Sequence, residues 1–129
     1  ILEAFSCTEC GRCTDVCPAN ITGKKLSPRK IMMDIRDRTN QVYQTRDNAS
    51  GSLFDFIENE EIFACTTCNA CVEACPVMIN PLKPILELRR YKILSESSGP
   101  SDWMPMFNSL ENRQSVWAIN ESRTNWIEQ

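Results

Sequence analysis

Residues 7–18 read CTECGRCTDVCP and residues 65–76 read CTTCNACVEACP. Both stretches follow one pattern, Cys-x-x-Cys-x-x-Cys-x-x-x-Cys-Pro, and the second copy lies 58 residues after the first. We name them the first and the second cysteine motif. Together they contain all eight cysteines of the chain, which are Cys7, Cys10, Cys13, Cys17, Cys65, Cys68, Cys71 and Cys75. The chain is therefore an internal duplication built around cysteine.

The spacing within each motif is typical of cysteines that bind iron–sulfur clusters. Three cysteines separated by two residues can wrap a short loop around one cube, and the fourth normally binds the neighbouring cluster. Iron in such clusters prefers soft, anionic sulfur ligands. We therefore expect two [4Fe–4S] clusters with crossed ligands: Cys7, Cys10, Cys13 and Cys75 for one cluster, and Cys65, Cys68, Cys71 and Cys17 for the other.

Other uses of eight cysteines compete with this interpretation. Structural zinc sites with four cysteines usually combine two separated Cys-x-x-Cys pairs, and they need neither a third cysteine at the same interval nor a Cys-Pro end. Disulfide frameworks have no reason to repeat one ligand spacing. The alternative function is a non-redox interaction module whose fold is stabilised by zinc. A third possibility is a thiol–disulfide switch that uses one of the motifs.

Composition narrows the functions that these residues can perform. The chain has no histidine, which excludes Rieske centres and any catalysis by a histidine base within it. The formal net charge is −3, so the basic footprint of a nucleic-acid-binding protein is missing. Apolar residues make up 42% and charged residues 24%, as in an ordinary globular domain. We expect no catalytic centre within these residues.

The sequence also limits how the chain meets a membrane. No apolar run approaches the roughly 18–20 residues of a transmembrane helix, and no signal peptide opens the chain. The sequence begins at Ile1 rather than at Met, so we expect a fragment of a longer protein whose missing part can include a membrane anchor. We place the protein in the cytoplasm, or at the cytoplasmic face of a membrane through missing segments or partners.

The segments that follow the motifs have the apolar spacing of helices. Ser27-Pro28 and Asn80-Pro81 each combine a capping residue with a proline suited to the first helical turn. We expect helices over 28–44 and 81–95, and one or two short helices over 53–63. Because no run alternates in the manner of paired strands, the predicted fold class is all-α, with two repeated cluster-binding loops and flanking helices.

The composition changes near residue 98. A linker rich in serine, with one glycine and one proline, follows the last predicted helix of the duplication. We therefore divide the chain into a dicluster domain over 1–98 and a tryptophan-containing extension over 99–129. One more helix is expected in this extension, over 108–119.

Polar residues near the motifs allow several interpretations. Four basic residues form either a solvated face or a docking surface for an acidic partner: Lys24, Lys25, Arg29 and Lys30. Three glutamates before the second motif are expected to face solvent: Glu58, Glu60 and Glu61. The pair Arg89-Arg90 is expected on an exposed helix face. Three threonines either donate hydrogen bonds to sulfur or are merely small loop residues: Thr8, Thr66 and Thr67.

The two motifs, the helical interval between them and the proline-started helices resemble the α-helical ferredoxin domain. This domain occurs in the C subunits of heterodisulfide reductase and of anaerobic glycerol-3-phosphate dehydrogenase, and in the iron–sulfur subunits of succinate dehydrogenase and fumarate reductase. The resemblance covers about residues 3–95. It implies an electron-transfer module that relays single electrons within a larger iron–sulfur oxidoreductase, next to a redox partner that carries a flavin or Cys-Cys-Gly motifs.

The end of the chain adds to this resemblance. The segment 108–112, the pair Val116-Trp117, and Arg123 with Trp126 are similar to the segment that leads, in larger oxidoreductases of this group, into a second domain with Cys-Cys-Gly motifs. The sequence given ends at Gln129 and contains no Cys-Cys-Gly. The resemblance therefore implies that any substrate chemistry belongs to other residues or to partner chains.

Overall fold

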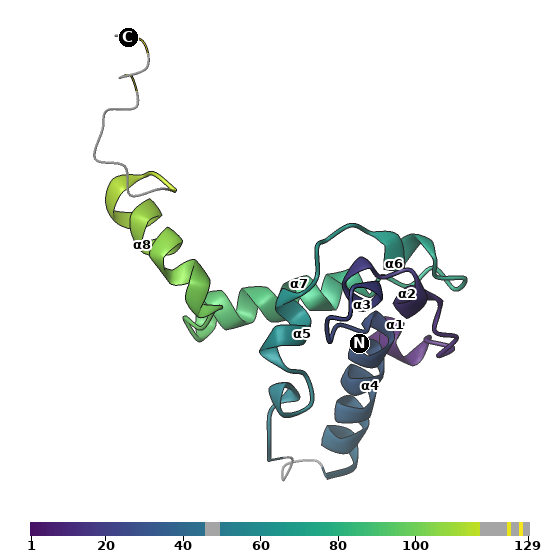
Figure 1. Ribbon diagram of the computed structural model, residues 1–129. Helices are drawn as coiled ribbons and strands as arrows, with labels where there is room; N and C mark the ends of the chain where they lie inside the picture. Colours follow the sequence, from purple (N-terminus) through teal and green to yellow (C-terminus); the bar gives the residue numbers. More distant parts are fainter. Residues whose placement is uncertain (46–49, 117–123, 125–126, 128–129) are drawn as a thin grey trace.

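The computed structural model describes residues 1–45 and 50–116, together with Thr124 and Ile127. All regular secondary structure in these residues is helical, and none of them forms a strand (Figure 1). The predicted all-α fold class is therefore confirmed.

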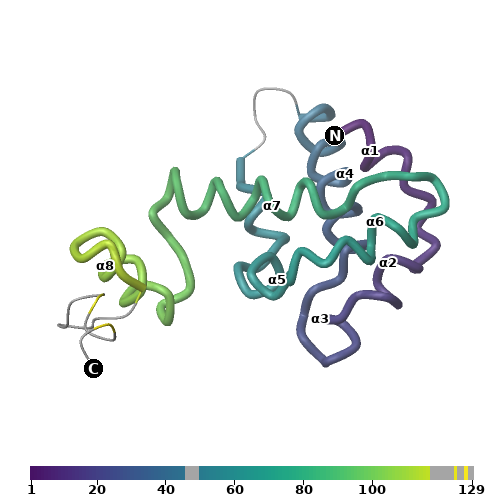
Figure 2. Tube along the Cα trace, turned by 90° about the horizontal axis from the view of Figure 1, so that it is seen from above, coloured from purple at the N-terminus to yellow at the C-terminus, as the bar shows by residue number. Residues whose placement is uncertain are grey.

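The helices are mostly short and lie around one long helix. In chain order they are α1 (Leu2–Phe5), α2 (Arg12–Asp15), α3 (Pro18–Ile21), α4 (Pro28–Thr45), the 3-10 turn η2 (Leu53–Asp55), α5 (Asn59–Phe63), α6 (Ala70–Glu73), α7 (Leu82–Arg90), the π-helical turn η3 (Tyr91–Ser95), the 3-10 turn η4 (Ser101–Trp103) and α8 (Met104–Arg113). Figure 2 shows α7 passing beside α4 and α5, with α2 and α6 together at one end of the bundle.

The two main helices begin where the sequence predicts. Pro28 is the first residue of α4, and the hydroxyl of Ser27 accepts a hydrogen bond from the backbone N–H of Lys30 at 3.3 Å. The side chain of Asn80 accepts a hydrogen bond from the backbone N–H of Lys83, in the first turn of α7, at 3.1 Å. Each side chain satisfies an N–H that the helix itself leaves without a partner.

The core lies where α4, α5 and α7 meet. Its buried residues are Cys17, Ala19, Leu26, Ile31, Ile57, Ile62 and Ile85. A second, smaller cluster contains Ala4, Met32 and Ile79. Each fully buried aliphatic side chain contributes about 1.5–3 kcal/mol, so a core of this size gives a modest total. One predicted cluster ligand, Cys17, belongs to the core itself, which places the cysteines directly against the packed interior.

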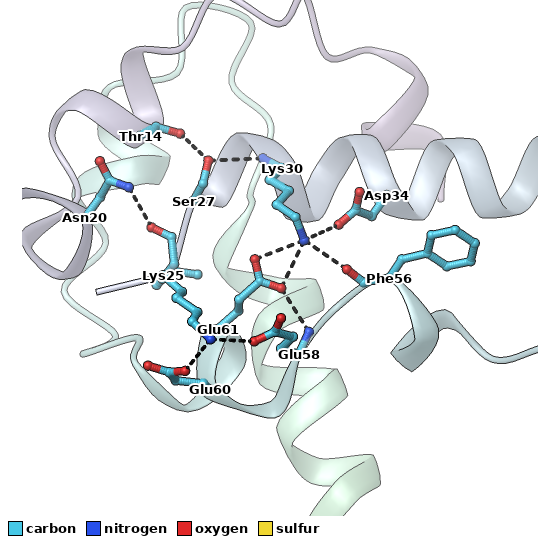
Figure 3. Close-up of polar contacts among 11 residues, drawn as sticks. Thr14, Asn20, Lys25, Ser27, Lys30, Asp34, Phe56, Glu58, Glu60 and Glu61 are labelled. Carbon is cyan, nitrogen blue, oxygen red and sulfur yellow. Dashed lines mark hydrogen bonds and ion pairs between the residues drawn. The ribbon is translucent and has the colours of Figure 1, made fainter. Parts of the chain in front are cut away.

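An ion pair with a buried carboxylate joins α4 to α5, and it shows that one prediction is wrong. Glu58 and Glu60 are exposed as expected, but Glu61 is only 4% exposed. Its carboxylate binds the ammonium of Lys30 at 3.0 Å and accepts from the backbone N–H of Glu58 at 2.9 Å (Figure 3). Lys30 also binds Asp34 at 2.9 Å. A carboxylate enters a core only with such partners, and here the cation comes from a helix distant in sequence.

The described residues after position 98 contain a helix with different bounds from those predicted. Helix α8 runs from Met104 to Arg113 rather than over 108–119, because a proline lies in its first turn and Gln114 ends it in the left-handed conformation at φ 55°. Trp103 packs edge-on against Phe63 of α5, with ring centroids 5.2 Å apart. The predictions for Trp117, Arg123 and Trp126 lie outside the described residues.

Within the part of the chain that the structure describes, no helix combines the length and the apolar character needed to cross a bilayer.

Candidate functional site

The two cysteine motifs adopt the same backbone conformation. Glu9 and Thr67, which are equivalent in the duplication, both have φ 58°. Gly11 and Asn69 are also equivalent, and both are left-handed, with φ values of 85° and 64°. Helices α2 and α6 begin directly after them. Glycine and asparagine are the residues that adopt this conformation most readily, so the duplication extends from the cysteines to the turns that carry them.

The eight cysteines gather around two hollows, which we name the first and the second hollow. Four cysteines lie in the wall of the first hollow: Cys7, Cys10, Cys13 and Cys75. Four others lie in the wall of the second: Cys17, Cys65, Cys68 and Cys71. Each hollow thus combines three cysteines of one motif with the last cysteine of the other. These groups are the two ligand sets expected from the sequence, although their binding to iron stays a prediction.

The sulfurs of the described cysteines do not converge on a single point. All eight cysteines lie within the described residues and are free thiols. In that part of the chain, no three Cys, Asp or Glu side chains converge as the ligands of one metal ion do. A zinc ion draws each sulfur to about 2.3 Å from a single point. In a cube each thiolate binds a different iron, so the sulfurs can surround a hollow at greater separation.

The two hollows are close neighbours. Helices α2 and α6, which carry Cys13 and Cys71, are in contact. Burial, followed by the charges of Cys65, Cys13, Cys17 and Cys68, raises the pKa of Cys71 to about 11. Burial is also the main reason why the pKa of Cys13 is raised, while its hydrogen bond with Thr14 acts in the opposite direction. Without a bound cation these crowded thiols resist ionisation, so metal binding must release their protons.

Hydrogen-bond donors reach the sulfurs of the second motif. The backbone N–H of Ala70, followed by the hydroxyl of Thr66, lowers the pKa of Cys68. Thr67 donates its backbone N–H to the sulfur of Cys65 at 3.4 Å, while its hydroxyl donates to a backbone carbonyl. In Thr67, therefore, the backbone N–H and not the hydroxyl is the group that reaches sulfur. Thr8 lies in the wall of the first hollow.

Arg89 is the polar residue near the site for which the sequence prediction is wrong. Arg90 is exposed as expected and pairs with Glu87 at 3.0 Å. Arg89 instead is half-buried and donates to the carbonyl of Ile62 at 2.6 Å and to the carbonyl of Cys65. It lies four residues after Ile85, which is completely buried, and residues four apart share one helix face. This spacing is a signal in the sequence that could have identified it.

The chain is also similar in sequence to known proteins. Residues 6–79 match the family described as "4Fe-4S dicluster domain". The chain belongs to this family. It therefore binds two [4Fe–4S] clusters and acts as an iron–sulfur electron-transfer module, and the zinc alternative has no support.

Several curated proteins are similar to the chain. The probable iron-sulfur-binding oxidoreductase FadF of Bacillus subtilis is 34% identical over 98% of this chain and 23% of its own length. The C subunit of the ferredoxin/F(420)H(2)-dependent CoB-CoM heterodisulfide reductase of Methanosarcina acetivorans is 37% identical over 71% of this chain and 48% of its own length. A probable membrane-anchored ferredoxin of Chromohalobacter salexigens is 29% identical over 85% of this chain and 19% of its own length.

These matches bear out the predicted resemblance to heterodisulfide reductase subunits. The chain corresponds to less than half the length of each of these relatives. No solved structure matches it.

Proposed function

We propose that the chain relays single electrons between two [4Fe–4S] clusters whose fourth ligands are exchanged between the two motifs. The first cluster takes Cys7, Cys10, Cys13 and Cys75, and the second takes Cys65, Cys68, Cys71 and Cys17. The observation that carries this proposal is the wall of each hollow, which joins three cysteines of one motif to one of the other. When bound, the clusters supply the one-electron redox change.

The protein's own residues keep the two sites close together and exclude water from part of them. Contact between α2 and α6 sets the separation of the two hollows. Cys17 and Cys71 are buried, which keeps water from the inner side of the second site. Cys10 and Cys68 are exposed, one in each hollow. These exposed corners are where a partner's redox group can approach, so each site has its own route to the surface.

The larger assembly is part of the same proposal. Because its relatives include an oxidoreductase and a heterodisulfide reductase subunit, we infer that the chain acts within a larger reductase of that type. The redox partner is a protein or domain that carries either a flavin or Cys-Cys-Gly motifs. A relative named as membrane-anchored supports a place at the cytoplasmic face of a membrane.

Single serine variants test the exchange of ligands. We expect anaerobically prepared protein to contain about eight irons and eight sulfides per chain, from two cubes of four. In Mössbauer and EPR spectra, Cys13→Ser and Cys75→Ser should alter one cluster, whereas Cys71→Ser and Cys17→Ser should alter the other. If Cys17→Ser instead alters the same cluster as Cys13→Ser, each motif ligates its own cube and the exchange is wrong.

A further inference from the structure

Two adjacent arginines of α7 have opposite surroundings. Arg90 is exposed, and its guanidinium is neutralised by Glu87 at 3.0 Å. Arg89 faces the core side of the helix and is half-buried. Among the described residues, no carboxylate lies within ion-pair distance of Arg89. A guanidinium stays protonated in proteins, so Arg89 brings an uncompensated positive charge into the partly buried region behind the second motif.

The contacts of Arg89 bracket the entry into the second motif. Its Nε donates to the carbonyl of Ile62, in the last turn of α5, at 2.6 Å. A terminal nitrogen donates to the carbonyl of Cys65, the first cysteine of the motif. The guanidinium carbon also lies 5.8 Å from the centre of the Phe63 ring. The planar guanidinium of Arg89 therefore donates to two carbonyls that accept no hydrogen bond within a helix. These two bonds fix the direction in which the chain enters the second motif.

The second hollow, unlike the first, has no Asp, Glu, Lys or Arg side chain among the described residues of its wall. Arg29 is among the residues that line the first hollow. The second hollow is lined, apart from its cysteines, by apolar and neutral polar residues, including Leu26, Leu82 and Ile85. Apolar surroundings screen charges weakly, so a cation held at the peptide of Cys65 acts there more strongly than the same cation in water.

We propose that Arg89 is the positioning residue of the second cluster: it holds the second motif in place and raises the reduction potential of the cluster that this motif binds. This inference rests on the proposed pair of clusters. Reduction adds one negative charge to a cluster, and a fixed cation beside a ligand favours the reduced form. Arg89 thereby makes the second cluster easier to reduce than its apolar wall alone would allow.

Neutral and charged variants at this position separate charge from shape. Arg89→Gln keeps hydrogen-bond donors but removes the charge, whereas Arg89→Lys keeps the charge without the fork. The matched control is Arg90→Gln, which removes the neighbouring charge on the exposed face. Each protein is prepared anaerobically with both clusters, and potentials are read by redox titration followed by EPR. The second cluster is identified as the one whose signal changes in Cys71→Ser.

The expected result is a lower midpoint potential for the second cluster alone in Arg89→Gln, with a smaller change in Arg89→Lys and none in Arg90→Gln. Selective loss of the second cluster from Arg89→Gln, with the first retained, also supports the positioning role. Unchanged potentials in Arg89→Gln, equal shifts in Arg89→Gln and Arg90→Gln, or equal loss of both clusters would overturn it. A wild-type protein without two clusters would instead refute the proposed function.

Discussion

The two halves of the chain agree at the cysteines and differ in what surrounds them. Their motifs share turn geometry at equivalent positions, and α2 corresponds to α6. The second hollow, however, opens onto the main core through Leu26 and Ile85, while the first lies against the smaller cluster that contains Met32 and Ile79. The repeated motif therefore places the cysteines in the same way twice, whereas the diverged helices set the stability and the electrostatics of each site.

The largest expected effect is a difference between losing one cluster and losing the other. Cys65→Ser should destabilise the fold more than Cys7→Ser, because Cys65 packs against the main core, whereas Cys7 packs against the smaller cluster. The extra cost is about 3 kcal/mol, on the scale of one buried core side chain. Thermal unfolding followed by circular dichroism under anaerobic conditions measures it. Equal losses of stability would show that the two halves do not differ in this way.

The next effect concerns the ion pair that joins α4, which follows the first motif, to Glu61 just before the second. Glu61→Ala leaves Lys30 without its buried partner and should cost about 2–3 kcal/mol, allowing for the partial exposure of that lysine. Glu60→Ala, the control, removes an exposed contact with Lys25 and should cost less than about 1 kcal/mol. Chemical denaturation of the cluster-loaded proteins compares them. Similar losses of unfolding free energy in the two variants would mean that the burial of Glu61 contributes nothing to stability.

The smallest effect probes the shared turns. Gly11→Ala adds a side chain at φ 85° and should cost about 1–2 kcal/mol, although its Cβ meets nothing nearer than Arg29 at 4.0 Å. Gly11→Asn should cost less, because asparagine already occupies the equivalent position 69 in the second motif. Melting temperatures of the two variants test this order. A reversed order would indicate that the two turns are not interchangeable.

Features that depend on residues close together in the chain could be predicted from the sequence. The grouping of the cysteines around two hollows agrees with the grouping predicted from their spacing, and the start of α4 follows from a cap and a proline beside each other. The start of α8 has a similar signal, since Pro105 lies in its first turn, but the helix predicted over 108–119 begins too late to use it. Local signals of this kind need no knowledge of the rest of the fold.

Features that depend on distant partners could not be predicted in the same way. Glu61 looks like its exposed neighbour Glu60, and only the approach of Lys30 from α4 explains its burial. The spacing of Arg89 from Ile85 indicates the face of α7 on which it lies, but only the packing of α7 against α5 gives it the carbonyl of Ile62 as a partner. When several residues of one type are adjacent, the sequence therefore does not show which of them makes contacts with a distant part of the chain.

The exchange of fourth ligands between the motifs is tested most directly by anaerobic crystals and anomalous scattering at the iron absorption edge. We predict two cubes of iron, with the sulfur of Cys17 bonded to the cube beside Cys65, Cys68 and Cys71, and that of Cys75 bonded to the other. Cys17 and Cys75 each bonded to the cube of their own motif, or one metal ion in place of each cube, would contradict this arrangement.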